Sequence, residues 1–531
     1  MALPEARTLP RLLDEMAGRF PDRNFVTDGE RRVSYAEFRL QVRALAKSFH
    51  ALGVRKNDKV ALLLGNQLEW LQVYFAVAAL GAVLVAVNTW WRRSELRHAL
   101  AITDSTVLVM ADRFGSCDYT AELAAIGDLA TELPALRHIV CLGEDPPPAA
   151  LSFQALRQLG ANVDDRDIDA AGNAVRPDDV ALIVFTSGST GRSKAAMLAH
   201  RGLIENPCHI GERMHVTEHD RLLLVLSLFW SASACNALFN LMTHGGSVVL
   251  ARRFDAGAIL KQIQDERCTV FYTLPNIVHA LYQHPDRGRY DLSSLRTGIC
   301  RAEVVHLLAE MGAQEYCTTY GLTEAYGNSC VADGRLPLEF RRAGAGFPLP
   351  GTELQIVDPA TRRPVPPGMA GEVRLRGYVM AGYYNDPERT REAIDDEGWL
   401  YTGDLAILDE RGFRFQCRLK EMIKTGGINV TPGEVEDLLQ AHPGVLQAVV
   451  VGVPDPVREE IVAAMVVPRD GHPLTAQELA GHCRAAAAAY KVPRFIDIVD
   501  AGAMPLTDTG KVSKRHVQER LARKYLEADA R

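Results

Sequence analysis

The sequence lacks two features that would have indicated a class of protein at once. None of its ten cysteines forms a CxxC pair, so neither a zinc ribbon nor a disulfide framework is indicated. It also lacks a basic excess, because 59 Lys and Arg residues stand against 66 Asp and Glu residues, for a net charge of −7. That balance argues against a nucleic-acid-binding protein. The scattered cysteines favour a reduced, cytoplasmic setting.

An apolar signal core is absent from Met1–Arg7, and charges are absent from two longer runs, Leu71–Asn88 and Leu222–Met242. Both runs reach the length of a membrane span. However, Gly81 interrupts the first, and the second contains three serines and two asparagines. A buried helix beside a buried strand has the same hydropathy, so we predict a soluble protein without a membrane span.

Apolar strand-like runs alternate with helical stretches over roughly the first 400 residues, a length of several folding units. We predict a strand at Lys59–Gly65, a helix at Glu69–Leu80 and a strand at Ala82–Val87, with further strands at Val180–Phe185 and Ser247–Leu250. This alternation is typical of α/β layers around a mostly parallel sheet.

The pattern changes after about Gly344. Short alternating strands with many Gly and Pro residues predict a β-rich subdomain at Gly346–Gly377. After Lys420 a compact α+β unit is expected, and the alanine run Ala485–Ala489 favours helix within it. Its predicted elements are helix Pro432–His442, strand Val445–Val453, strand Ile461–Val467 and helix Thr475–Tyr490. We therefore predict a large N-terminal domain, 1–418, and a small C-terminal domain, 419–531.

A loop rich in glycine and hydroxyl groups follows one predicted strand directly. It reads Thr186-Ser-Gly-Ser-Thr-Gly-Arg-Ser-Lys194. Its glycines allow close approach of an anion, and its hydroxyls and lysine can donate to phosphate oxygens. It is not a Walker loop, because Ser193 precedes Lys194 and Ala195 follows it. A flexible surface loop is the alternative interpretation.

Two further motifs combine an aromatic ring, a glycine and a carboxylate. In Tyr320-Gly-Leu-Thr-Glu324 the ring can stack on a base and the carboxylate can hold Mg²⁺, although a turn before a helix looks the same. In Tyr401-Thr-Gly-Asp404 an aspartate after a tight glycine turn can accept hydrogen bonds from a ribose diol. An Asx-turn that closes a hairpin is the alternative there.

The last two motifs are basic and contain Thr-Gly turns. They are Arg418-Leu-Lys-Glu-Met-Ile-Lys-Thr-Gly-Gly427 and Pro505-Leu-Thr-Asp-Thr-Gly-Lys511. A lysine on such a turn can act as a mobile point charge, and a solvated surface turn is the alternative.

In this order and spacing the five motifs resemble those of the adenylate-forming superfamily, which includes acyl-CoA synthetases, luciferases and the adenylation domains of peptide synthetases. The resemblance extends from about Leu9 to Val517. It implies a large domain and a small mobile one. It also implies a ligase that joins a carboxylate to ATP and then passes the acyl group to a thiol, usually that of coenzyme A.

The resemblance also implies roles for individual residues. Lys511 would neutralise charge at the reacting phosphorus, Thr323 would bond the α-phosphate, and Glu324 would hold Mg²⁺. The ATP and AMP site would comprise Thr186, Ser187, Gly188, Ser189, Thr190, Gly191, Lys194, Tyr320, Gly321, Asp404 and Arg418. Lys420 matches the hinge between the domains, and Thr425, Gly426 and Gly427 would line the coenzyme A tunnel. The acyl pocket would comprise Trp230, Ser231, Ala234, Cys235, Cys300 and Thr318, an apolar set that favours a hydrophobic carboxylic acid.

Several positions depart from the family pattern. Relatives usually carry Pro-Lys-Gly where this chain has Ser193-Lys194-Ala195, and a histidine where it has Trp230. The Gly-Gly-Ala-Pro stretch expected beside adenine is replaced within Arg296–Glu303, and a glycine pair near Val457 is altered. These departures keep open a protein with weak ATP activation that forms the thioester from a supplied acyl-adenylate.

Three other functions also stay open. The chain could load a carrier protein instead of coenzyme A, although we expect no carrier domain to be fused to it. It could be a luciferase-like oxygenase, or a binding protein that keeps the fold without catalysis. The acid and the thiol acceptor are not specified by the sequence, and a homodimer is an assembly that it leaves open.

Overall fold

Two compact units make up the chain. The computed structural model describes residues 3–186, 193–425, 428–455, 458–487, 489–507 and 511–529. Unit 1 contains Met1–Leu354, Leu375–Leu400 and Arg411–Phe413. Unit 2 contains Gln355–Arg374, Tyr401–Glu410 and Arg414–Arg531. The α/β class is confirmed, and the division at 418/419 stays a prediction.

An eight-stranded sheet forms one half of unit 1. Its order is β21 (Gly382–Tyr383), β11 (Lys194–Ala199), β10 (Val180–Thr186), β4 (Val83–Ala86), β3 (Lys59–Leu63), β5 (Val107–Ala111), β8 (His138–Leu142) and β9 (Leu151–Ser152). Pairing is parallel from β10 to β9 and antiparallel at β11 and β21. The prediction of a mostly parallel sheet is therefore confirmed. Both faces of such a sheet are covered, which explains the uninterrupted apolar runs in β3 and β4.

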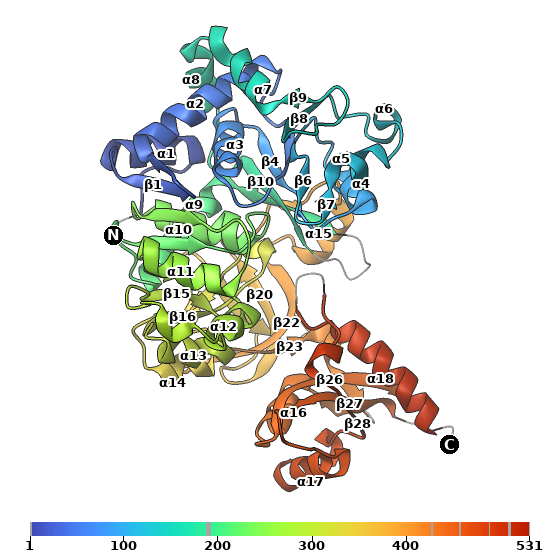
Figure 1. Cartoon of the computed structure of the whole chain (residues 1–531). Helices are drawn as coiled ribbons and strands as arrows, with labels where there is room; N and C mark the ends of the chain where they lie inside the picture. The colour runs from blue at the N-terminus through green and yellow to red at the C-terminus, as the bar shows by residue number, and fades with distance from the viewer. Residues whose placement is uncertain are drawn as a thin grey trace. The chain divides into compact units, whose positions relative to one another are not determined.

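A nine-stranded sheet forms the other half. Its order is β18 (Phe347–Pro348), β17 (Cys330–Val331), β16 (Glu315–Tyr320), β15 (Thr297–Cys300), β14 (Val270–Phe271), β12 (Arg221–Leu224), β13 (Ser247–Leu250), β1 (Asn24–Asp28) and β2 (Arg31–Ser34). The strands from β1 to β16 pair in parallel. Helices α11 (Ala256–Glu266), α12 (Pro275–Tyr282) and α13 (Val305–Glu310) lie side by side along this sheet (Figure 1).

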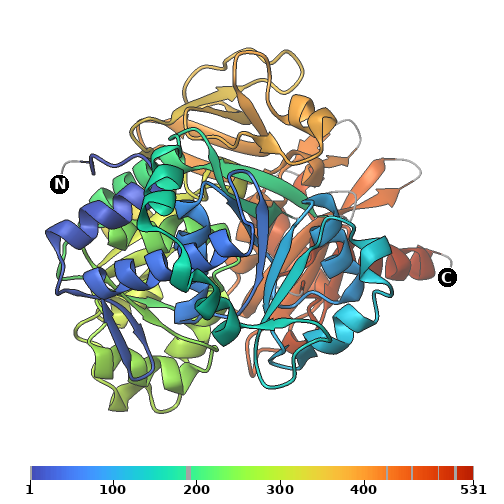
Figure 2. The same ribbon diagram turned by 90° about the horizontal axis from the view of Figure 1, so that it is seen from above.

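Buried aromatic rings join the N-terminal helices to this second half of unit 1. The helices are α1 (Leu9–Arg19), α2 (Tyr35–Ala51) and α3 (Leu68–Ala79), drawn in blue beside green segments in Figure 2. Tyr74 and Phe75 of α3 both meet Phe239 of α10 (Leu238–Met242), with ring centroids 5.8 Å and 5.9 Å apart. Edge-on aromatic contacts of this kind add to the free energy that burial alone provides.

The two uncharged runs of the sequence form buried elements. The first contains most of α3 and then β4, as predicted. The second contains β12, a six-residue π-helix at Ala232–Ala237 and α10. Among the residues that the structure describes, no helix combines the length and the apolar character that crossing a bilayer requires. All ten cysteines of the chain are buried, free thiols.

The C-terminal part of unit 2 is the predicted α+β fold. Its sheet has the order β25 (Ile428–Val430), β24 (Ile423–Thr425), β27 (Glu459–Pro468) and β26 (Val445–Asp455), and β28 (Phe495–Ile498) pairs with β27. Helices α16 (Pro432–Gln440) and α17 (Ala476–Ala486) pack on one face and α18 (Lys514–Asp529) on the other. Because both faces are covered, Ala448, Val449, Val450 and Val451 alternate between two apolar cores. Unit 2 also contributes to a second sheet, β19 (Glu353–Val357), β20 (Ala370–Arg376), β22 (Leu400–Asp409) and β23 (Gly412–Arg418).

One predicted helix is too long. The alanine run was expected to continue the helix to Tyr490, but α17 ends at Ala486 and Ala487 is extended, with φ −144° and ψ 163°. The last buried residue of α17 is Cys483, and Ala485 and Ala486 at the end of the helix are exposed. Helix propensity without packing is a weak constraint, and here it does not decide the structure.

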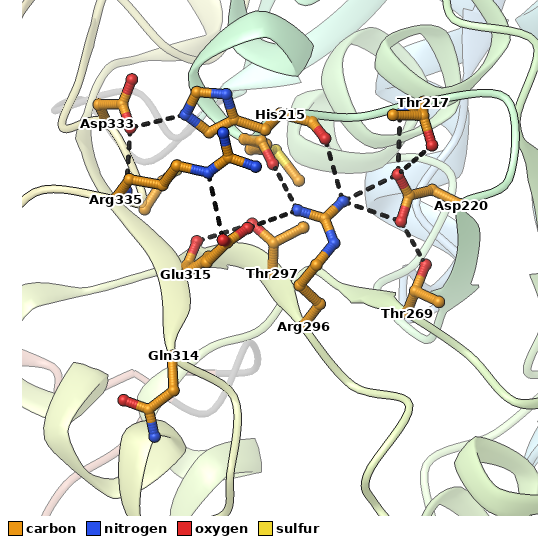
Figure 3. Close-up of polar contacts among 12 residues, drawn as sticks. His215, Thr217, Asp220, Thr269, Arg296, Thr297, Gln314, Glu315, Asp333 and Arg335 are labelled. Carbon is orange, nitrogen blue, oxygen red and sulfur yellow. Dashed lines mark hydrogen bonds and ion pairs between the residues drawn. The ribbon is translucent and has the colours of Figure 1, made fainter.

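An ion-pair network closes the amino ends of the central strands of the nine-stranded sheet. The Arg296 guanidinium lies between two carboxylates, with Nη2 at 2.8 Å from Asp220 Oδ2 and Nη1 at 2.7 Å from Glu315 Oε2 (Figure 3). It also donates to the carbonyl oxygens of Met214 and His215. Arg296 precedes β15, Asp220 precedes β12 and Glu315 begins β16. The network therefore fixes three parallel strands relative to one another.

We predict that Arg296→Ala lowers the free energy of unfolding by about 2–4 kcal/mol, because it leaves the buried Asp220 carboxylate without its cation. The measurement is the urea midpoint of unit 1, detected by hydrogen exchange of the backbone amides in β15 and β16. Arg335→Ala is the control, since its side chain is 60% exposed and pairs only at the rim of the network. That change should cost less than about 1 kcal/mol. Equal losses in both variants would contradict the central role of Arg296.

A buried histidine joins α1 to α9 (His200–Arg213). His200 is 0% exposed, and its Nδ1 accepts a hydrogen bond of 3.2 Å from the backbone N–H of Leu9. Burial lowers the pKa of His200 to about 4 from its ordinary 6.5. The imidazole is therefore neutral in the folded protein at pH 7 and serves as a hydrogen-bond acceptor.

This burial makes stability depend on pH in a defined direction. Between pH 4 and 6.5 the unfolded chain binds a proton that folded His200 does not, so the stability present above that window is lost as the pH falls through it. The full loss is about 3 kcal/mol. We predict that His200→Gln, which keeps an acceptor for Leu9, flattens the loss of urea resistance between about pH 7 and about pH 5. His219→Gln, at a side chain 79% exposed, should leave the profile unchanged.

Candidate functional site

The two ends of the predicted phosphate loop lie opposite each other. Thr186 ends β10, Lys194 begins β11, and the two residues are antiparallel register partners. Ser187, Gly188, Ser189, Thr190 and Gly191 lie outside the described residues. The described part of the motif is thus the base of a hairpin at the carboxyl end of the parallel strand β10. Ligands of open α/β sheets bind at such carboxyl ends.

The Glu324 carboxylate lies at the centre of the site. Its Oε1 accepts a hydrogen bond of 3.2 Å from Thr186 Oγ1 and another of 2.8 Å from the Tyr383 hydroxyl. Glu324 follows β16 in a short 3-10 turn, Thr323–Ala325. The hydrogen bond to Thr186 therefore joins the carboxyl ends of one strand from each sheet of unit 1.

Tyr383 also contacts the lysine of the predicted loop. Lys194 Nζ lies 4.7 Å from the centroid of the Tyr383 ring, a cation–π distance. Burial, and then the neighbouring Glu324 carboxylate, raises the pKa of Tyr383. Its hydroxyl therefore stays protonated and donates to Glu324.

A further hydrogen bond connects the Thr323–Glu324 turn to the predicted acyl segment. The hydroxyls of Ser231 and Thr323 are 2.9 Å apart. The turn is held from behind by Tyr326, a left-handed residue with φ +58° whose hydroxyl accepts from the backbone N–H of Ala199. The Tyr326 ring occupies the space beside Gly202, where an added Cβ would lie 2.2 Å from ring carbon Cζ. The position of Thr323 and Glu324 is therefore fixed by packing.

Tyr320 and Gly321 have structural contacts of their own. The Tyr320 ring is 7% exposed and stacks on Phe413, with centroids 4.3 Å apart. Gly321 packs against its own turn, because an added Cβ would lie 2.0 Å from the carbonyl oxygen of Gly327. The close approach predicted for this glycine is thus an approach to the backbone of the same turn.

Three aromatic rings meet where the family resemblance implies a histidine, and one of them is Trp230 at that position. Trp90, Phe229 and Trp230 meet pairwise, with centroids 5.3–5.5 Å apart and interplanar angles of 75–86°. Trp230 is half-buried, and the π-helix begins two residues later. Single-turn π-bulges occur frequently at functional sites.

The other four predicted acyl-pocket residues are buried. Ala234 and Cys235 belong to the π-helix, and each is 0% exposed. Cys300 and Thr318 are register partners on β15 and β16, and Thr318 donates to the carbonyl oxygen of Gly344. Cys300 lies at the carboxyl end of its strand, and the replacement for the expected glycine stretch continues from it as Arg301, Ala302 and Glu303. Arg301 and Glu303 are exposed.

The predicted ribose residues meet within unit 2. Arg418 Nε lies 2.7 Å from Asp404 Oδ1, and Asp404 is 2% exposed. The predicted tight turn before Asp404 is wrong, because Tyr401–Asp404 lies inside strand β22. Gly403 nevertheless has φ +68°, and its N–H donates to Glu372 Oε1. A left-handed glycine inside a strand bends the strand, as a β-bulge does.

Lys420, Thr425 and Lys511 also belong to unit 2. Lys420 is exposed in a 3-10 turn, Leu419–Glu421, and Thr425 ends β24 and is 7% exposed. Gly426 and Gly427 lie outside the described residues. Lys511 is exposed, and its backbone N–H donates to Thr507 Oγ1.

Three residues at these contacts were not predicted. Tyr383 contacts both Glu324 and Lys194, Trp90 packs on Trp230, and Phe413 stacks on Tyr320. The pair Gly382-Tyr383 was a signal for the first, since a glycine beside an aromatic residue at a strand edge often marks a close approach. The other two depend on contacts distant in sequence, and no local pattern indicates them.

The site contains hydrogen-bond donors that can bind phosphate, and it contains one carboxylate that can bind a cation. Within the described ranges no group of three His, Cys, Asp or Glu side chains could hold a metal ion. A fully protein-built metal centre is therefore not indicated there. Mg²⁺ in nucleotide sites is commonly held by one or two carboxylates together with phosphate oxygens and waters, and Glu324 fits that pattern.

Comparison with known proteins identifies the family of the chain. Residues 13–384 match the AMP-binding enzyme family, and residues 434–511 match the AMP-binding enzyme C-terminal domain. The chain is 36% identical to the putative acyl-CoA synthetase YngI of Bacillus subtilis (strain 168), with 97% of each chain covered. It is 33% identical to the mitochondrial medium-chain acyl-CoA ligase ACSF2 of Danio rerio, with 97% of this chain and 88% of the relative covered.

A solved structure extends the likeness to three dimensions. ATP-bound MatB from Rhodopseudomonas palustris superposes with a TM-score of 0.84 at 27% identity, covering 97% of this chain and 99% of that one. Since the family match spans most of the chain and the curated relatives cover nearly all of it, this chain belongs to the AMP-binding enzyme family, the adenylate-forming superfamily that its five ordered motifs resemble.

Proposed function

We propose that this enzyme is an AMP-forming acyl-CoA ligase for a hydrophobic carboxylic acid. The observation that carries the proposal is the hydrogen bond between Ser231 and Thr323. It connects the aromatic cluster of Trp90, Phe229 and Trp230 with the turn that holds Glu324. An apolar acid and the phosphate groups of ATP would therefore meet at this connection. The names of the curated relatives support the same reaction.

In the first step an oxygen of the acid attacks the α-phosphorus of ATP, and the bond to pyrophosphate breaks. Thr323 would donate to the α-phosphate, and Thr186, Lys194 and the loop between them would hold the β- and γ-phosphates. Lys511 would neutralise the negative charge that grows at phosphorus. Catalysis of this kind depends on positioning and electrostatic stabilisation more than on covalent participation of the protein.

Mg²⁺ would be held by Glu324, and when bound it would neutralise charge on the phosphates. Both hydrogen bonds to the Glu324 side chain use Oε1. Asp404 and Arg418 would bind the ribose hydroxyls, and Tyr320 would stack on adenine.

In the second step the thiol of coenzyme A attacks the acyl carbon, and AMP leaves. Lys420 would be the hinge that brings a second face of the small domain to the site. Thr425, Gly426 and Gly427 would line the path of the thiol arm, where small residues give room. The aromatic cluster favours an apolar acid, because a charged group there would lose hydration without gaining a partner.

A ligation screen tests the proposal. The protein is incubated with ATP, Mg²⁺, coenzyme A and medium-chain, aromatic or polycyclic acids, and products are identified by mass. An ATP-dependent acyl-CoA supports the proposal. If thioester forms only from supplied acyl-adenylate, the half-reaction would replace the proposal. The replacement of the expected glycine stretch within Arg296–Glu303 favours that alternative. Loading of a carrier protein, light emission with a luciferin, or no turnover would favour the other three alternatives.

We predict that Lys511→Ala lowers acid-dependent pyrophosphate release by about 10²- to 10³-fold, the usual effect of removing one group that stabilises charge in a transition state. Thioester formation from supplied acyl-adenylate should be retained, because that step breaks the acyl C–O bond and makes or breaks no bond to phosphorus. Lys261→Ala, at an exposed lysine on α11, is the matched control. Unchanged pyrophosphate release in the Lys511 variant would show that its role is misassigned.

A further inference from the structure

Tyr383 separates the two opposite charges of the site in unit 1. Lys194 Nζ contacts the ring, 4.7 Å from its centroid, and the Tyr383 hydroxyl donates to Glu324 Oε1 at 2.8 Å. In the part of the chain that the structure describes, Lys194 and Glu324 each contact Tyr383, and they form no ion pair with each other. The cation and the carboxylate therefore both contact the same aromatic side chain.

The position of Tyr383 is fixed by its own contacts. Its strand β21 pairs with β11, with Tyr383 opposite Ala196, and its backbone N–H donates to Thr390 Oγ1 at 2.9 Å. Gly382, with φ +133°, brings the chain so close to Thr390 that an added Cβ would lie 2.8 Å from Thr390 Cγ2. Tyr383 is 5% exposed. The ring has little freedom to swing away from Lys194 and Glu324.

The same segment holds Glu324 at a second point. The backbone N–H of Met380 donates to the carbonyl oxygen of Glu324 at 2.7 Å. Thr186 and Tyr383 both donate to Oε1, and no donor from the described residues reaches Oε2. The carboxylate is thus oriented through one oxygen and keeps the lone pairs of the other.

We propose that Tyr383 is a positioning residue that holds Glu324 for a divalent cation and keeps Lys194 apart from it for phosphate. The inference rests on the proposed function, in which these two groups bind Mg²⁺ and ATP. A direct ion pair between Lys194 and Glu324 would have to break before either group could bind its ligand. The ring offers Lys194 a weaker partner, and the hydroxyl orients Glu324 without neutralising it.

Tyr384 is a matched control beside it in the sequence. Its ring also contacts a lysine, with Lys59 Nζ 5.2 Å from the centroid, and its hydroxyl donates to a carboxylate oxygen of Asp104 at 3.4 Å. These partners lie outside the site. Tyr383→Phe and Tyr384→Phe therefore remove the same atom, a hydroxyl that donates to a carboxylate, at the site and away from it.

The first measurement is the affinity of the full-length enzyme for Mn²⁺ in the presence of a non-hydrolysable ATP analogue. Binding is detected by electron paramagnetic resonance. Tyr383→Phe should weaken Mn²⁺ binding by about tenfold or more, as loss of an outer hydrogen bond to a metal ligand does. Nucleotide affinity in EDTA should stay within about twofold, because the ring that faces Lys194 remains. Tyr384→Phe should match the wild type in both.

A second variant tests the separation of charges. Tyr383→Leu removes ring and hydroxyl together, so Lys194 should pair with Glu324 and nucleotide affinity in EDTA should also fall. Adding Glu324→Gln to Tyr383→Leu should restore that affinity, because the competing carboxylate is gone. Circular dichroism and the thermal midpoint establish that each variant is folded.

The outcomes are distinguishable. Wild-type Mn²⁺ affinity in folded Tyr383→Phe would overturn the positioning role, and no recovery of nucleotide affinity in the double variant would overturn the separation of charges. Absence of Mn²⁺ and nucleotide binding in the wild type would instead overturn the proposed function, and the role of Tyr383 with it.

Discussion

The hydrogen bonds to Glu324 Oε1 constrain the active half of unit 1. Thr186 comes from the eight-stranded sheet, and Glu324 follows the last parallel strand of the nine-stranded sheet. Thr186 donates its hydrogen bond to a single carboxylate oxygen of Glu324. Two separately wound sheets can meet at one oxygen only if the carboxyl ends of β10 and β16 face the same place. The packing of Tyr326 on Gly202 and the contact of α3 with α10 maintain that alignment. Geometry at the site therefore depends on packing well away from it.

The charged residues at the two ends of the nine-stranded sheet have different kinds of partner. At the amino ends, the Nη1 and Nη2 atoms of Arg296 are committed to Asp220, Glu315 and two carbonyls. At the carboxyl ends, Glu324 contacts uncharged side chains, as does Lys194 of the eight-stranded sheet, so each charge keeps capacity for a ligand. Fully paired charges stabilise a fold, whereas incompletely neutralised charges in a half-buried place are characteristic of binding sites. The sequence segment Arg296–Cys300 runs from the first environment to the second within one strand.

Sequence patterns were sufficient where burial alone decides the structure. Strand β13 was predicted at its observed bounds, Ser247–Leu250, because a short apolar run covered on both faces has few alternatives. The five motifs gave the family and most of the residues that now cluster in unit 1. The sequence could not provide Tyr383 as the partner of Glu324, because that contact depends on the register between β11 and β21. Nor could it indicate that Gly403 lies inside a strand, or that α17 ends at Ala486.

The burial of every cysteine has a chemical consequence for an enzyme of this proposed kind. An acyl-adenylate is a strong acylating agent, and the thiolate of a protein cysteine would compete for it with the intended acceptor. Here burial raises the pKa of Cys208 to about 11 and that of Cys268 to about 12, so both thiols stay protonated and inert at neutral pH. Since all ten cysteines are enclosed, the chain presents no thiol of its own to self-acylation or to mixed disulfides with a thiol substrate. The thiol that reacts with the acyl-adenylate is thereby supplied by the incoming substrate.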